Sequence, residues 1–232
     1  MIGADTPSAR RWNEGRPSLF SRFAYDVVRN VFSIALRVWV RLEVHGAERI
    51  PLTGPVILAP VHRSNLDAPV VAALTGRRSR FMGKEALWKH PRLGRLWSAM
   101  GAIPVLRGSV DREALRACET VLSIGQPLVM FPEGTRREGA LIENLFDGPA
   151  FLAARTGAPI LPIGIGGSSH AMGRGAKWVR PTKVVALIGE PIPAPGPTEG
   201  GRASRRAVRD LTARLERELQ ALYDEAQARA GQ

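Results

Sequence analysis

Cysteine, acidic residues and long apolar runs are scarce in this sequence. Each of these scarcities excludes some kinds of site, segment or partner. Cys118 is the single cysteine, which excludes a disulfide framework and a cysteine-rich metal site and indicates a reducing compartment. No run of about 18 apolar residues occurs, so we expect no membrane-spanning helix. The sequence has 33 basic and 21 acidic residues, so its net charge is +12. This surplus indicates an anionic partner such as membrane headgroups, a phosphorylated substrate, an acidic carrier protein or nucleic acid.

Composition and periodicity divide the chain into four segments. Residues 1–17 are polar and contain proline and glycine, which is typical of a flexible arm. Residues 18–41 predict an amphipathic helical region, and residues 42–192 a domain of alternating strands and helices. Residues 193–232 predict a linker and a C-terminal amphipathic helix.

The amphipathic region carries an apolar stripe with arginines on its other positions. The stripe recurs at steps of three and four and consists of Leu19, Phe23, Val27, Val31, Ile34 and Val38. Such a helix suits the plane of a membrane interface, and we therefore predict a membrane-associating helix. The alternative is that this helix simply packs on the core of its own domain.

Within residues 42–192, short apolar runs alternate with helical patterns. Strands are predicted at 42–45, 56–59, 101–107, 128–131, 160–165 and 184–188, and helices at 68–75, 111–124 and 150–156. We therefore predict an α/β fold with a mixed, mostly parallel central sheet flanked by helices. The basic, tryptophan-containing segment 77–97 is expected to contact lipid, an acidic carrier or nucleic acid, unless it is only a solvated helix face.

A histidine and an aspartate follow one of the predicted buried strands. His62 comes after the strand 56–59, and Asp67 lies at the start of the next helix. A carboxylate in this place can orient an imidazole and stabilise it once it has taken a proton, so the pair is a candidate general base with its orienting partner. The alternative is a partly buried histidine beside a helix-capping aspartate.

Four segments, in this order, resemble the motifs of the glycerolipid acyltransferases and are most similar to those of the 1-acyl-glycerol-3-phosphate acyltransferases. They are Val-His-Arg-Ser-Asn-Leu-Asp at 61–67, Gly-Ala-Ile-Pro-Val-Leu-Arg at 101–107, Phe-Pro-Glu-Gly-Thr-Arg at 131–136 and Leu-Pro-Ile at 161–163. The resemblance covers about residues 42–192 and implies an acyltransferase domain. The implied reaction moves a fatty acyl group from acyl-CoA or acyl carrier protein to the free hydroxyl of lysophosphatidic acid, giving phosphatidic acid.

The resemblance also implies roles for individual residues. His62 would be the general base, Asp67 its orienting partner, and Arg107 and Arg136 the ligands of the acceptor phosphate. The chemistry fits these roles, because an aliphatic hydroxyl needs a base before it attacks and arginine binds phosphate with two parallel hydrogen bonds. No enzyme nucleophile is required, so we predict a ternary complex and no covalent acyl-enzyme.

Further substrate contacts are predicted around these residues. Glu133 is expected to orient Arg136 or to accept a hydrogen bond from the glycerol part, and Gly134 and Thr135 to offer donors in a tight turn. For the oxyanion of the tetrahedral intermediate, the Lys84 ammonium and backbone N–H groups near residues 104–105 are candidates between which the sequence does not choose.

Expectations about partners follow from the same reaction. We expect a lysophospholipid acceptor, an acyl thioester donor and an anionic membrane surface, with the protein peripheral at the cytoplasmic face. We expect no metal, because no ligand-spaced cluster of histidines or carboxylates occurs. No cofactor is expected beyond the thioester co-substrate. Nucleic acid is not expected, because a binding module would have no use for His62 and Asp67.

Two positions depart from the family pattern. Val61 stands where the family usually has asparagine, and Asp147 where it often has lysine. These departures leave open the same chemistry on another acceptor, such as glycerol 3-phosphate, a different lysophospholipid or a glycolipid hydroxyl. A remote alternative is a basic membrane- or nucleic-acid-binding module without catalysis.

Overall fold

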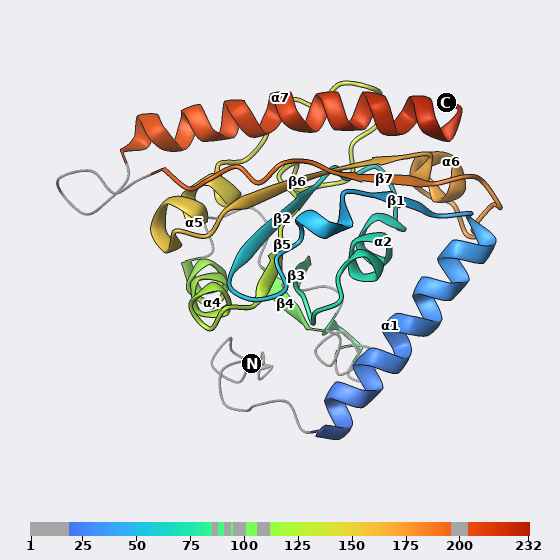
Figure 1. The fold of residues 1–232 in the computed structure, drawn as a ribbon, viewed down its shortest axis with the longest axis horizontal. Helices are drawn as coiled ribbons and strands as arrows, with labels where there is room; N and C mark the ends of the chain where they lie inside the picture. The colour runs from blue at the N-terminus through green and yellow to red at the C-terminus, as the bar shows by residue number, and fades with distance from the viewer. Residues whose placement is uncertain (1–18, 85–87, 91–93, 95–100, 106–111, 196–203) are drawn as a thin grey trace, which may run out of the picture.

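A seven-stranded sheet lies at the centre of the computed structural model, which describes residues 19–84, 88–90, 94, 101–105, 112–195 and 204–232 (Figure 1). The strands are β1 (Glu43–His45), β2 (Val56–Pro60), β3 (Arg80–Lys84), β4 (Ala102–Val105), β5 (Pro127–Val129), β6 (Ile160–Gly166) and β7 (Val185–Ile188). The helices are α1 (Leu19–Trp39), η2 (Ala47–Arg49), α2 (Asp67–Leu74), α4 (Arg112–Ser123), α5 (Gly148–Thr156), α6 (Ser168–Met172) and α7 (Arg205–Ala230). The predicted arm and most of the predicted linker lie outside the described residues.

The sheet is mixed and mostly parallel. Its strand order is β1-β7-β6-β2-β5-β3-β4. Strands β2 to β6 all run in one direction, whereas β7 is antiparallel to β6 and β1 is parallel to β7. Every residue of β2 and β6 is buried, which accounts for their unbroken apolar sequences. The predicted fold class is confirmed, and the carboxyl ends of five neighbouring strands meet at one edge.

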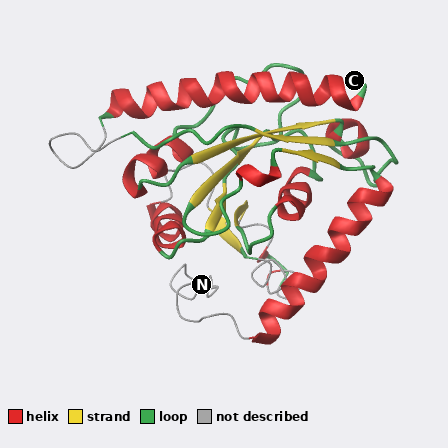
Figure 2. Ribbon diagram, in the orientation of Figure 1, coloured by secondary structure: helices red, strands yellow, loops and turns green. Residues whose placement is uncertain are grey.

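The C-terminal helix α7 lies along β6 and β7, on the opposite side of the sheet from α1 and α2 (Figures 1 and 2). It buries residues at steps of four, Leu211, Leu215, Leu219 and Tyr223. Glycines in β6 let the helix approach closely, because a Cβ at Gly164 would lie 2.4 Å from the carbonyl oxygen of Leu222. The backbones of strand β6 and helix α7 are therefore in close contact.

Helix α1 packs against α2 but leaves most of its apolar stripe uncovered. Leu36 and Val40 are buried in the core. The described stripe residues are not, with exposed fractions of 43% for Val27, 61% for Val31, 63% for Ile34 and 72% for Val38. The helix therefore packs on its own domain through another face, as the alternative expected, while these four residues of the stripe stay uncovered. No described helix combines the length and the apolar character that crossing a bilayer requires.

Three elements were not predicted from the sequence, namely the short helix η2, strand β3 and helix α6. The basic segment 77–97 contains strand β3, which pairs with β4 and β5. Two of its described arginines turn toward the protein. Arg77 donates to the carbonyl oxygens of Pro51 and Gly125, at 2.9 and 2.5 Å. Arg80 donates to Gln126 at 2.8 Å, and burial, with Arg78 nearby, lowers the pKa of Arg80 to about 10. The glycine-rich stretch after β6 contains the short helix α6.

Candidate active site

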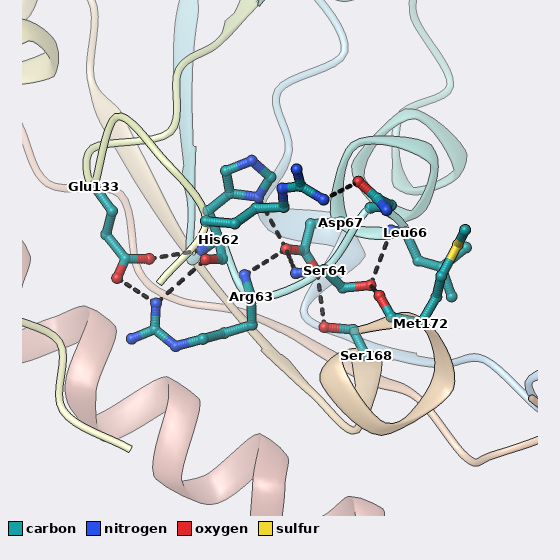
Figure 3. Close-up of polar contacts among 10 residues, drawn as sticks. His62, Arg63, Ser64, Leu66, Asp67, Glu133, Ser168 and Met172 are labelled. Atoms are coloured by element: carbon teal, nitrogen blue, oxygen red, sulfur yellow. Dashed lines mark hydrogen bonds and ion pairs between the residues drawn. The ribbon is translucent and has the colours of Figure 1, made fainter. Parts of the chain in front are cut away.

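Three adjacent parallel strands deliver the residues of the site. The chain leaves β2 just before His62, leaves β5 just before Glu133, and leaves β6 just before Ser168. Because β2 lies between β5 and β6, these three segments meet beyond one edge of the sheet (Figure 3). This is the edge at which parallel α/β sheets gather ligand-binding groups.

His62 and Asp67 form the predicted pair. His62 Nδ1 lies 3.0 Å from Asp67 Oδ2, while the side chain of His62 is 17% exposed and that of Asp67 fully buried. The His62 ring stacks on Phe131 with a centroid distance of 4.0 Å. Because a carboxylate only accepts hydrogen bonds, Nδ1 carries the hydrogen and the lone pair lies on Nε2. In this tautomer of the neutral ring, Nε2 is the nitrogen that can accept a hydrogen bond.

The Asp67 carboxylate is held by three further donors. Its Oδ2 accepts hydrogen bonds from the backbone N–H groups of Arg63 and Ser64, each at 2.6 Å. Its Oδ1 accepts from Ser168 Oγ at 2.7 Å. The hydroxyl of Ser64 donates to the carbonyl oxygen of Met172 at 2.6 Å, which ties the same loop to α6 (Figure 3). A buried anion with this many donors has a fixed orientation, and it therefore fixes the imidazole ring.

Glu133 is placed differently from the expectation. Its carboxylate is fully buried, accepts a hydrogen bond from the backbone N–H of His62 at 2.7 Å, and forms an ion pair with Arg63. Arg63 also donates to the carbonyl oxygens of His62 at 3.3 Å and Leu141 at 2.9 Å. In the described structure, the hydrogen bonds and the ion pair of this buried carboxylate go to His62 and Arg63, and none goes to Arg136. We expected Glu133 to orient Arg136. It instead forms a buried contact with Arg63 and with the backbone of His62.

Helix α7 contacts the Arg63–Glu133 ion pair through Tyr223. The Arg63 guanidinium lies 5.2 Å above the ring of Tyr223. Burial raises the pKa of Tyr223, and the adjacent Arg63 guanidinium counteracts part of that rise. The loop that carries His62 is thus supported by a helix about 160 residues further along the chain.

Arg136 lies beside the His62 loop. Its Nη1 donates to the side-chain oxygen of Asn65, and the backbone N–H of Arg137 donates to the carbonyl oxygen of His62 at 2.9 Å. Two segments that are about 70 residues apart therefore share one surface. Asn65 and the backbone of His62 thus connect the loop that carries the imidazole with the segment that carries Arg136.

Gly134 and Thr135 form the exposed turn that precedes Arg136. The N–H of Gly134 donates to the carbonyl oxygen of Phe131 at 3.0 Å, and that of Thr135 to the carbonyl oxygen of Glu133 at 2.8 Å. Gly134 has a φ of +66°, a conformation that favours glycine. Both backbone donors are engaged within the turn, which leaves the Thr135 hydroxyl as the candidate donor to a ligand.

Lys84 and Arg107 are only partly placed. Lys84 is the last residue of β3 and pairs with Val105 at the end of β4, so its backbone lies at the same edge of the sheet as the site. The side chain of Lys84 and all of Arg107 lie outside the described part of the chain. Among the described residues, no group of three His, Cys, Asp or Glu side chains is arranged to hold a metal ion.

The structure places both departures from the family pattern, Val61 in the core and Asp147 beside α7. Val61 is fully buried in the core. The Asp147 carboxylate accepts a hydrogen bond from Thr212 of α7 at 2.6 Å, and its own side chain does not cap α5.

Several residues of the site were not singled out from the sequence. Ser168, Arg63 and Asn65 contact Asp67, Glu133 and Arg136 respectively. A signal existed for Ser168, since it is a polar residue directly after a buried strand. Arg63 and Asn65 lie within the histidine motif, where only the histidine and the aspartate were interpreted.

Comparison with known proteins identifies the family. The family model described as Acyltransferase matches residues 41–166, more than half of the chain. The chain is 27% identical over 177 residues to the chloroplastic 1-acyl-sn-glycerol-3-phosphate acyltransferase LPAT1 of Arabidopsis thaliana, covering 74% of this chain and 49% of that protein. It is 22% identical over 169 residues to the 1-acyl-sn-glycerol-3-phosphate acyltransferase of Bacillus subtilis, covering 72% and 82%.

A solved structure shares the fold. The crystal structure of the 1-acyl-sn-glycerophosphate acyltransferase PlsC from Thermotoga maritima superposes with a TM-score of 0.73 at 24% identity, covering 94% of this chain and 86% of that one. The chain spans about half the length of the plant relatives that it matches, such as LPAT1. The matched region includes both the His62 loop and the Glu133–Arg136 turn, and this chain belongs to the acyltransferase family.

Proposed function

We propose that the protein transfers a fatty acyl group from an acyl thioester, acyl-CoA or acyl carrier protein, to the free hydroxyl of lysophosphatidic acid, giving phosphatidic acid. The observation that carries this proposal is the His62–Asp67 pair, with 3.0 Å between Nδ1 and Oδ2 and a buried carboxylate held by three other donors. The names of the similar proteins support the choice of acceptor.

In the proposed mechanism, His62 Nε2 takes the proton of the acceptor hydroxyl as its oxygen attacks the thioester carbonyl. The tetrahedral intermediate then expels the thiolate, which receives that proton from His62. Asp67 holds the ring and stabilises the imidazolium between the two steps. The thioester supplies the activated acyl group, so no cofactor is proposed. Direct transfer also agrees with the position of Cys118, which is fully buried in the core.

Arg136 is the proposed ligand of the acceptor phosphate. Asn65 holds its guanidinium beside the loop of His62, so one acceptor can reach both the base and the cation. Arg107 and Lys84 stay proposed further contacts, to the phosphate and to the oxyanion respectively. The Thr135 hydroxyl and the turn at Gly134 are proposed to complete the acceptor site.

The proposed location is the cytoplasmic face of a membrane, where the protein binds peripherally. The exposed apolar stripe of α1 supports this location, because an uncovered row of large aliphatic side chains is unfavourable in water and favourable at a lipid interface. Arg37 and Arg41 at the end of the helix are exposed and suit anionic headgroups. Nucleic acid is not a proposed partner.

A thiol-release assay with the purified protein tests the reaction. Acyl-CoA and acyl carrier protein would each be offered with lysophosphatidic acid, glycerol 3-phosphate and a neutral lysolipid. We expect release only with an acceptor, and fastest release with lysophosphatidic acid. His62→Ala should lower the rate by about 10²–10⁴-fold, whereas His90→Ala, an exposed histidine elsewhere, should not change it. Faster turnover of glycerol 3-phosphate would overturn the acceptor, and thiol release by His62→Ala at the normal rate would overturn the mechanism.

A further inference from the structure

The segment between α6 and β7, residues 173–183, carries the most exposed tryptophan among the described residues. Trp178 is 83% exposed. Arg174, Lys177 and Arg180 around it are exposed too. No Asp or Glu occurs between Asp147 and Glu190, so no acid on this segment compensates these charges. We call residues 173–183 the Trp178 loop.

The Trp178 loop is joined to the end of α1. The indole N–H of Trp39 donates to the carbonyl oxygen of Val179 at 2.9 Å. Backbone hydrogen bonds continue the contact, since the N–H of Val184 donates to the carbonyl oxygen of Val40 at 3.0 Å. Lys183 also forms an ion pair with Glu43 at 3.0 Å. The loop and the end of α1 therefore lie together at one side of the molecule (Figure 1).

The same loop is joined to the active site. It begins at the end of α6, whose first residue, Ser168, holds Asp67, and whose last residue, Met172, accepts the hydrogen bond of Ser64. The N–H of Arg180 donates back to the carbonyl oxygen of Ala171 at 2.8 Å. A basic hollow of about 360 Å³ lies between α6 and the loop, lined by His170, Arg174 and Arg180 among others.

We infer that the Trp178 loop is a second membrane contact, which inserts Trp178 into the interface of an anionic lipid surface beside the stripe of α1. A tryptophan with an apolar body and an N–H group favours the headgroup region, and the surrounding arginines and lysine match negatively charged lipids. The loop continues from α6, which holds Asp67 through Ser168, so this contact would keep the His62 site close to the bilayer. The inference rests on the proposed membrane association of α1, but not on which acceptor is used.

The charge of the face favours lipid over the other occupants. A second copy of this chain would bring an equally basic loop against this one, and like charges oppose that contact. Trp39, which contacts the loop, is 55% exposed, and the neighbouring Val38 of α1 is 72% exposed, so apolar surface continues along the helix. An elongated apolar strip rimmed by basic residues fits a planar anionic surface.

Vesicle binding by the full chain tests the inference. Protein would be sedimented with vesicles of phosphatidylcholine, with and without phosphatidylglycerol. Trp178→Ala should weaken binding to the anionic vesicles about tenfold, since a large apolar side chain would leave the interface. Leu52→Ala is the matched control, because Leu52 is 86% exposed but precedes β2, at the opposite end of that strand from His62. Replacing Arg174, Lys177 and Arg180 by glutamine should remove most of the preference for phosphatidylglycerol.

A variant of α1 distinguishes the inference about the Trp178 loop from the proposed membrane association of α1. Ile34→Asn with Val38→Asn should also weaken binding. If the α1 variant binds less tightly while Trp178→Ala binds like the parent protein, the inference about the loop is wrong and the role of α1 stands. If neither variant changes binding, the proposed membrane association is wrong as well.

Two further measurements complete the test. Quenching by brominated lipid should be smaller in Trp178→Phe than in the parent protein, and equal quenching would contradict insertion. With acceptor dispersed in detergent, Trp178→Ala should turn over like the parent protein, which separates docking from chemistry. A changed oligomeric state of Trp178→Ala without lipid, or poorer use of acyl carrier protein with unchanged vesicle binding, would identify a protein interface and overturn the inference.

Discussion

Ser168 Oγ donates a hydrogen bond to Asp67 Oδ1 at 2.7 Å, although 101 residues separate the two in sequence. Ser168 is fully buried and is the first residue of α6, directly after β6. The other oxygen of Asp67 serves His62 and two backbone N–H groups. The Ser168 hydroxyl therefore binds Oδ1, whereas His62 and its loop bind only Oδ2. We propose that Ser168 is a positioning residue for the proposed base.

Ser168→Ala should lower kcat about tenfold and leave the KM of the acceptor unchanged, because Asp67 would keep three donors but orient His62 less firmly. Steady-state kinetics with varied acceptor would measure this split. Ser169→Ala, which changes the neighbouring and partly exposed hydroxyl, is the control and should have no effect. If KM rose instead while kcat held, Ser168 would belong to the acceptor site and the positioning role would be wrong.

Arg136→Ala should raise the KM of lysophosphatidic acid about 10- to 100-fold with little change in kcat, because a phosphate contact is made in the ground state and the transition state alike. Arg137→Ala is a matched control, since Arg137 is exposed and contributes its backbone N–H to His62, which the substitution keeps. Initial rates over a range of acceptor concentrations decide the result. Equal KM values for the two variants would contradict the phosphate assignment.

The part of this architecture that sequence predicts best is the part that is uniformly buried. Strands β2 and β6 are unbroken apolar runs because both of their faces are covered, and His62 and Asp67, which follow β2, could be identified as site candidates. Strand β3 was missed because the basic residues of segment 77–97 were interpreted as contacts to an anionic partner or as a solvated face, whereas Arg77 and Arg80 turn inward to backbone and side-chain acceptors. Long arginine side chains hide such contacts from any periodicity argument.

Contacts between distant segments were beyond sequence reasoning. The spacing of His62 and Asp67 indicated their pairing, but nothing local shows that Glu133 accepts a bond from the N–H of His62, or that Tyr223 covers Arg63. Helix α1 shows a related limit. Its periodicity reveals an apolar stripe but does not say which side of the helix meets the core, and the structure answers by burying Leu36 and exposing Val31.

Glu133→Gln should lower the free energy of unfolding by about 3–5 kcal/mol, because it leaves the Arg63 guanidinium buried without its counter-charge. The exposed fractions of the two side chains are 0% and 2%, so solvent does not screen the pair. Urea unfolding would measure the loss. Glu138→Gln, an exposed glutamate in the same loop, should cost almost nothing.

The double variant Glu133→Gln with Arg63→Met separates charge from shape. It removes both charges, keeps an acceptor for the N–H of His62, and places an apolar chain beneath Tyr223. We expect it to be more stable than Glu133→Gln alone. A double variant that was less stable than the single one would show that Arg63 matters through its other hydrogen bonds, to His62 and Leu141, more than through the ion pair.

Gly164→Ala should destabilise the fold and lower activity together. A Cβ at this position would lie 2.4 Å from the carbonyl oxygen of Leu222, and backbone atoms of a long helix cannot swing aside as the end of a side chain can. Helix α7 must therefore lift from β6, at a cost of about 1–3 kcal/mol. Tyr223 follows Leu222 directly, so lifting the helix also uncovers Arg63 and loosens the support of the His62 loop. Gly76→Ala has open space around the new methyl group and should leave both urea unfolding and turnover unchanged. If Gly164→Ala lost stability but kept full turnover, α7 would stabilise the fold without supporting the site.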